Sequence, residues 1–111
     1  MSENCIFCKI ANGEIPSQFV YESKNTVVFN DINPQAPTHL LVVPKVHVES
    51  LRELSDPALM AELLESVKAA AEKLGIKDYR TVINTGRDAG QEVFHLHIHV
   101  MAGREFGWPA G

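Results

Sequence analysis

The sequence predicts an α+β domain, a mostly antiparallel five-stranded sheet with one long helix packed on it. Segments rich in β-branched and aromatic residues come first, then one long helical pattern, then two more extended segments. The chain has 111 residues, fewer than a typical domain of about 150, so we expect a single domain over residues 1–111. An apolar fraction of 45% is ordinary for a globular chain and excludes a disordered one.

The first half of the chain predicts a hairpin followed by a central strand. A short helical turn is expected at residues 5–10. Residues 19–22 and 26–30 are extended segments separated by a polar turn, the pattern of a β-hairpin. Residues 31–37 contain two prolines and predict a loop. Residues 39–44 are almost continuously apolar, which is typical of a strand covered on both faces.

The second half begins with the clearest helix. Ser55 or Asp56 can cap it, Pro57 suits its first position, and Gly75 ends it. Apolar residues recur at helical spacing between these ends: Leu59, Leu63, Val67, Ala70 and Leu74.

Two more strands complete the predicted sheet. They are expected at residues 79–84 and 94–101, separated by a turn-rich loop at 85–90. The tail, residues 103–111, is irregular and aromatic. A small open sheet needs cover at its edges, which favours pairing with a second protomer.

Three of the five histidines alternate with apolar residues on the last predicted strand. His95, His97 and His99 therefore share one face, along about 13 Å of strand, while the apolar residues face the helix. Such a row suits neither a hydrophobic core nor an ordinary exposed face of a sheet, because the polar imidazole edge is costly to bury. Two functions remain open. One is metal binding, which needs a further ligand from elsewhere, and the other is phosphate chemistry with imidazole as nucleophile and donor.

Charge and hydropathy exclude several partners and compartments. The net charge of −4 argues against bulk binding to nucleic acid. No apolar run approaches the ~18 residues that cross a bilayer, so we expect no membrane association. The N-terminus lacks a basic segment followed by an apolar one, so we expect a cytoplasmic protein.

In a reducing compartment, the Cys5-x-x-Cys8 pattern indicates half of a metal site or a redox pair. Its place at the N-terminus favours the metal.

The segment His95-Leu96-His97-Ile98-His99-Val100-Met101 resembles the motif of the histidine triad (HIT) family. The segments 30–39 (NDINPQAPTH) and 40–45 (LLVVPK) are similar to the upstream signature of its Hint branch. Gly90-Gln91 and Trp108-Pro109 fit the same branch, so the resemblance covers almost the whole chain.

The resemblance implies a HIT-like fold and a hydrolase of purine nucleoside 5'-phosphoramidates, acting through a nucleotidyl-histidine intermediate. His97 would be the nucleophile, and His99 would contact the phosphoryl oxygens and help to protonate the amine. His39 would help to hold the tautomer of His97, and His95 would buttress the network. No cofactor would be needed for catalysis. The alternatives are a dinucleoside polyphosphate hydrolase, which the short segment after Met101 disfavours, and a nucleotide-binding regulatory or adaptor module with low activity.

The same resemblance implies a nucleotide-binding cleft. Asp31 would accept hydrogen bonds from the ribose hydroxyls. Many Hint relatives have serine where this chain has Glu92, which puts side-chain help from that position in doubt. Apolar residues would surround the purine base, and others would hold the phosphate: Phe7, Ile10, Phe29, Ile32 and Leu41 for the base, and Asn84, Gly90, Gln91 and Val93 for the phosphate.

Some bacterial relatives pair an N-terminal C-x-x-C with two histidines, which implies a structural zinc held by Cys5, Cys8, His47 and His95. Otherwise both cysteines are small reduced apolar residues. The resemblance also implies a homodimer with a continuous sheet, in which the C-terminal tail with Phe106 and Trp108 reaches the partner's site.

Overall fold

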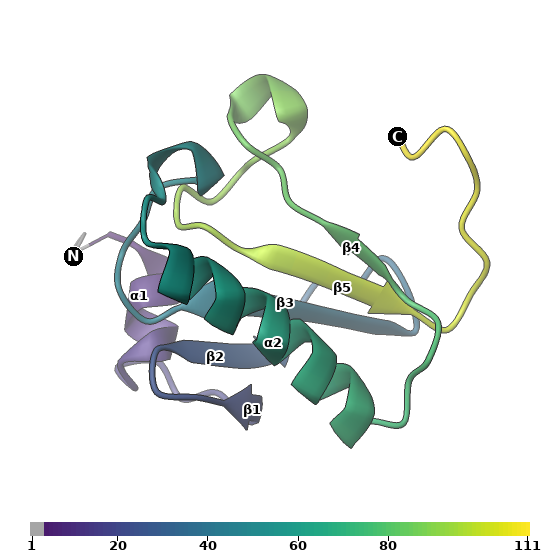
Figure 1. The fold of residues 1–111 in the computed structure, drawn as a ribbon, viewed down its shortest axis with the longest axis horizontal. Helices are drawn as coiled ribbons and strands as arrows, with labels where there is room; N and C mark the ends of the chain where they lie inside the picture. Colours follow the sequence, from purple (N-terminus) through teal and green to yellow (C-terminus); the bar gives the residue numbers. More distant parts are fainter. Residues whose placement is uncertain (1–3) are drawn as a thin grey trace.

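The computed structural model describes residues 4–111. Its five strands form one sheet in the order β1-β2-β3-β5-β4 (Figure 1). Every neighbouring pair of strands is antiparallel, as the sequence predicted. The strands are β1 (Phe19–Glu22), β2 (Thr26–Asn30), β3 (Thr38–Pro44), β4 (Arg80–Val82) and β5 (Ile98–Ala102).

The long helix α2 (Pro57–Lys73) crosses one face of the sheet (Figure 1). The Asp56 side chain caps it by accepting hydrogen bonds from the backbone N–H groups of Ala58 and Leu59. Its apolar stripe packs on residues that point to this face from the three central strands. This core contains Leu59, Leu63, Val67 and Ala70 of the helix, and Val28, Leu40, Val42, Ile98 and Val100 of the sheet.

The short helix α1 (Ile6–Ala11) covers the opposite face of the sheet. It follows Cys5, whose sulfur accepts a hydrogen bond from the backbone N–H of Cys8. A second core lies beneath it, made of α1 side chains and of residues from β2 and β3: Cys5, Phe7, Cys8, Val27, Phe29, Leu41 and Val43. The sheet is therefore covered by α2 on one face and by α1 over β2 and β3 on the other. No helix within residues 4–111 is both long and apolar enough to span a bilayer.

The last strand is shorter than the predicted segment 94–101, because β5 begins only at Ile98. Its ladder with β3 ends at the pair Val42–Ile98. Before that pair the chain turns away, and the backbone N–H of Leu96 bonds to the carbonyl of Val48 instead (2.7 Å). The alternation of faces survives this change. Leu96 still lies in the core under α2, while His95 and His97 face Phe7 of α1.

Gly103, directly after β5, is expected to tolerate no side chain. Its φ is +98°, and an added Cβ would lie 2.8 Å from the Cβ of Pro37. Gly103→Ala should therefore lower the free energy of unfolding by roughly 1–3 kcal/mol, measured by urea unfolding. Gly107→Ala is the matched control, since nothing lies within 4 Å of its added Cβ. Equal stability of the two variants would contradict this expectation.

Candidate active site and metal centre

His97 is buried, and its ring is fixed from two sides. Its Nδ1 lies 2.7 Å from the backbone carbonyl oxygen of His95. A carbonyl can only accept, so Nδ1 carries the proton and Nε2 keeps a free lone pair. The edge of the Phe7 ring packs against the imidazole at a centroid distance of 5.1 Å. The backbone therefore sets the tautomer that a nucleophilic histidine needs.

His99 has the opposite tautomer. The Gln35 N–H donates to Nδ1 of His39 (3.0 Å), so the proton of a neutral His39 is on Nε2. This Nε2 lies 2.9 Å from Nδ1 of His99, which must accept. The proton of a neutral His99 is therefore on its Nε2. The rings of His97 and His99 lie 5.0 Å apart, so an acceptor and a donor stand side by side.

Both rings are neutral near pH 7. Burial is the main cause that lowers the pKa of His97 below its usual range. Burial, with repulsion from His97 and His39, lowers the pKa of His99 to about 4. In this neutral pair, Nε2 of His97 offers a lone pair and Nε2 of His99 offers an N–H. A nucleophilic attack on phosphorus requires such a lone pair.

Two of the expected roles change when the contacts are known. His39 bonds to His99, and the tautomer of His97 is held by a backbone carbonyl. The ring of His95 does not join this network, because it turns toward Cys5 and Cys8. No sequence pattern could have shown this, since the group that orients His97 is a main-chain atom.

Asp31 lies at the end of the histidine chain. One carboxylate oxygen accepts from the backbone N–H of Asn33 (2.9 Å), and the other lies 3.4 Å from Nε2 of His39. Asp31, His39 and His99 are close enough together to hold a metal ion. The Gln35 N–H argues against it, because it leaves the only proton of His39 on the nitrogen that would bind the metal. This group is better described as a hydrogen-bond chain.

The residues expected around the base are only partly brought together. Phe7, Phe29 and Leu41 share the core under α1, and Ile10 and Val93 pack against it. The rings of Phe7 and Phe29 meet edge to face at 5.7 Å. By contrast, Ile32, also expected at the base, is 97% exposed, and Trp108, which was expected to reach the partner's site, is 86% exposed.

The loop expected to hold the phosphate is braced by Gln91. Its side chain accepts from the N–H of Gly86 and donates to the carbonyls of Glu49 and Val93. Gln91 thus shapes the loop and has little left for a ligand. Asn84 lies beside Gly90, since a Cβ built there would come within 3.7 Å of the Asn84 amide. Glu92 is exposed.

Cys5, Cys8, His47 and His95 bring one ligand atom each to a single place, all within 4.8 Å of one another. Nδ1 of His95 lies 3.2 Å from Sγ of Cys5 and 3.4 Å from Sγ of Cys8. Nδ1 of His47 lies 3.3 Å from Sγ of Cys8. A tetrahedral zinc with bonds of 2.0–2.3 Å separates its ligands by roughly 3.5 Å, so the spacing fits.

The orientation of His95 also fits a metal ligand. Its Nε2 lies 2.8 Å from the carbonyl oxygen of Pro44, so Nε2 carries the proton and the Nδ1 lone pair faces the sulfurs. The ring is fully buried, and burial is the main cause that lowers its pKa to about 4. A neutral imidazole between two thiols is a donor set typical of zinc.

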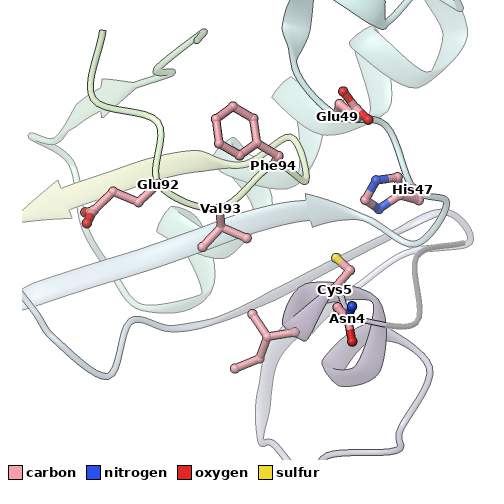
Figure 2. A pocket seen from close by; sticks show the side chains of 8 residues that line it. Asn4, Cys5, His47, Glu49, Glu92, Val93 and Phe94 are labelled. Atoms are coloured by element: carbon pink, nitrogen blue, oxygen red, sulfur yellow. The ribbon is translucent and has the colours of Figure 1, made fainter. Parts of the chain in front are cut away.

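A hollow of about 380 Å³ lies beside this group, with Cys5 and His47 in its wall (Figure 2). Four residues that the sequence did not indicate line it as well: Asn4, Ile6, Glu49 and Phe94. Figure 2 shows the Glu92 carboxylate pointing away from Cys5 and His47. No sequence pattern indicates these residues, because they surround the four candidate metal ligands without contributing a ligand atom.

Comparison with known proteins agrees with the fold and with the histidine motif. The HIT domain matches residues 12–106. Protein HitA of Neisseria gonorrhoeae is 52% identical over 102 residues, which cover 89% of this chain and 95% of that protein. The 14 kDa zinc-binding protein of Zea mays is 44% identical over 112 residues, which cover 96% of this chain and 87% of that protein.

A solved structure is similar over nearly the whole length. It is the crystal structure of a HIT family hydrolase from Legionella pneumophila Philadelphia 1, with a TM-score of 0.92 and 46% identity. The match covers 97% of this chain and 100% of that one. The chain therefore belongs to the HIT family.

Proposed function

We propose that this chain is a Hint-branch hydrolase that cleaves the P–N bond of purine nucleoside 5'-phosphoramidates. The observation that carries the proposal is the pair of opposite tautomers on His97 and His99. One ring presents a lone pair and its neighbour presents an N–H, which are the two groups needed to attack phosphorus and to release an amine.

The first step is attack by Nε2 of His97 on the α-phosphorus. The P–N bond breaks, and the leaving nitrogen accepts a hydrogen bond from Nε2–H of His99 and takes a proton from solvent, so the amine departs neutral and His99 keeps its own proton. The nucleotidyl group is then bonded to His97, and the positive charge of that ring is stabilised by the hydrogen bond from Nδ1–H to the His95 carbonyl. Water attacks phosphorus in the second step, the bond between phosphorus and Nε2 of His97 breaks, and a proton passes to solvent, which releases the nucleoside monophosphate and restores the neutral ring of His97.

The nucleotide would lie on the face of the sheet that carries α1. Asp31 would accept from the ribose hydroxyls through lone pairs that Asn33 does not use. The base would pack on Phe7 and its apolar neighbours, and Asn84 with the backbone at Gly90 and Val93 would hold the phosphate. A homodimer would cover Ile32 and Trp108, the two most exposed large apolar side chains of residues 4–111.

We further propose that Cys5, Cys8, His47 and His95 bind a structural zinc. A set of four protein ligands leaves no open position for a substrate, so a bound zinc would cross-link the segment before α1 to the sheet. Catalysis itself would be left to the histidines. The name of the maize relative, the 14 kDa zinc-binding protein, supports this assignment.

An adenosine 5'-phosphoramidate with a fluorescent amine tests the proposed reaction. We expect the amine to be released and a rapidly quenched digest to contain adenylylated His97, identified by mass spectrometry. Label on another residue would contradict the assignment of the nucleophile. Cleavage of dinucleoside polyphosphates alone would support the polyphosphate hydrolase, and nucleotide binding without any cleavage would support the regulatory module.

A further inference from the structure

The Cys5–Cys8 pair is reachable from solvent. Cys5 lines the 380 Å³ hollow, which Figure 2 shows between the start of α1 and the segment that carries His47. Cys5 is 8% exposed, whereas Cys8 is only 1% exposed. A small solute can therefore meet the sulfur of Cys5 first, with that of Cys8 behind it.

The two cysteines are also placed for mutual reaction. Neither forms a disulfide, and their sulfurs lie within 4.8 Å of each other. They are three residues apart at the first turn of α1, where side chains are neighbours. The Cys8 N–H donates to Sγ of Cys5 (3.2 Å), a bond that stabilises negative charge on that sulfur.

Two contacts connect this pair with the nucleophile. The ring of His95 touches both sulfurs, while the backbone carbonyl of the same residue holds Nδ1 of His97. Phe7, which lies between the cysteines in the sequence, packs its ring on both His95 (6.0 Å) and His97 (5.1 Å). A change at the sulfurs therefore acts on the orientation of His97 and on the wall beside it.

We propose that Cys5 and Cys8 are an oxidation site through which a peroxide controls nucleotide binding. The two thiolates lose two electrons and form a disulfide. The O–O bond of hydrogen peroxide breaks and, with two protons, gives two molecules of water. The inference rests on the proposed metal site, because the sulfurs in a disulfide no longer serve as thiolate ligands and the zinc is released.

Release of zinc removes the cross-link that fastens α1 to the sheet. Only His47 and His95 remain as ligands, fewer than the four that a structural site needs. Helix α1 has six residues, too few to be stable by itself, so only its apolar packing would then hold it on the sheet. Phe7 then loses its fixed position against His97, and the carbonyl of His95 loses the anchor provided by its ring.

The test treats the zinc-loaded protein with hydrogen peroxide. We expect release of one zinc per chain to a chromogenic chelator, loss of both thiols, and binding of AMP weakened about tenfold, in the range found when groups that orient a site are lost. Dithiothreitol with zinc should restore all three. Loss of both thiols with unchanged AMP affinity would overturn the proposal, and so would retention of zinc.

Two variants separate this site from oxidation elsewhere. Cys5→His/Cys8→His keeps four ligand side chains but cannot form a disulfide, so peroxide should leave its AMP affinity at the starting value. Cys5→Ser/Cys8→Ser should bind AMP as weakly as the oxidised wild type and should not change further. A peroxide effect in either variant would place the effect at other residues, such as methionine, and overturn the proposal.

The controls also separate this inference from the proposed function. Untreated protein without zinc would overturn both the metal site and the oxidation site, while the phosphoramidate assay would still decide the hydrolase. Untreated protein that holds zinc and cleaves substrate, yet keeps its zinc in peroxide, would overturn the oxidation site alone.

Discussion

Replacing His97 with alanine is expected to slow the release of a fluorescent amine from an adenosine phosphoramidate by at least about 1,000-fold. The substitution removes the atom proposed to form the covalent intermediate, and no second histidine can replace it. Nδ1 of His99 is already bonded to His39, and its Nε2 carries a proton. His95 is fully buried against the two cysteines. The measurement is kcat/KM under steady-state conditions.

A loss of activity alone would not prove a chemical role, since His97 is buried and packs on Phe7. His97→Gly provides the matched test. Free imidazole can enter the space left by the ring and attack phosphorus, so added imidazole should restore part of the rate to His97→Gly. The folded state is checked by thermal unfolding of both variants. A correctly folded His97→Ala protein that keeps the wild-type rate would refute the proposed nucleophile.

Removal of the proposed zinc is expected to have the largest effect on stability. At free zinc 100 to 1,000 times its dissociation constant, binding adds roughly 3–4 kcal/mol to the free energy of unfolding. For a domain of this size, such a loss lowers the melting temperature by roughly 10–20 °C. A strong chelator should produce this shift in the wild type, and Cys8→Ser should start from the lower value.

The combination of chelator and variant isolates the metal from the cost of the substitution. Cys8→Ser places a hydroxyl in a site that is only 1% exposed, which destabilises the protein by itself. The chelator should therefore have no further effect on this variant. An equal shift in the wild type and in Cys8→Ser would mean that the chelator acts elsewhere and that the four-residue group does not hold the metal.

The sequence predicted the elements well where local chemistry determines their ends. The cap at Asp56 and the proline after it set the start of α2, and the hairpin of β1 and β2 has the predicted bounds. The start of β5 was predicted four residues too early. Alternation continues through residues 94–97, but the ladder stops where Leu96 bonds to Val48, a tertiary contact that no local pattern encodes.

Side-chain chemistry was easier to predict than geometry in the candidate site. The Cys5-x-x-Cys8 spacing indicated half of a metal site, the family resemblance implied His47 and His95 as its other ligands, and the structure brings all four together. The partners of the proposed catalytic histidines could not be predicted, because a main-chain carbonyl orients His97 and a main-chain N–H sets the proton of His39. Main-chain groups are the same at every position, so only folding shows which of them is used.

The strict alternation along residues 95–100 limits the insertions and deletions that this part of the chain can accept. The histidines face one core and Leu96, Ile98 and Val100 face the other, so both surfaces are occupied. Deleting or inserting one residue here would exchange the two sets and place imidazoles under α2 and aliphatic groups at the proposed phosphate site. Changes of length must therefore accumulate elsewhere, in exposed connections such as residues 85–90. Within this segment, the face on which each side chain lies is set by the number of residues that precede it.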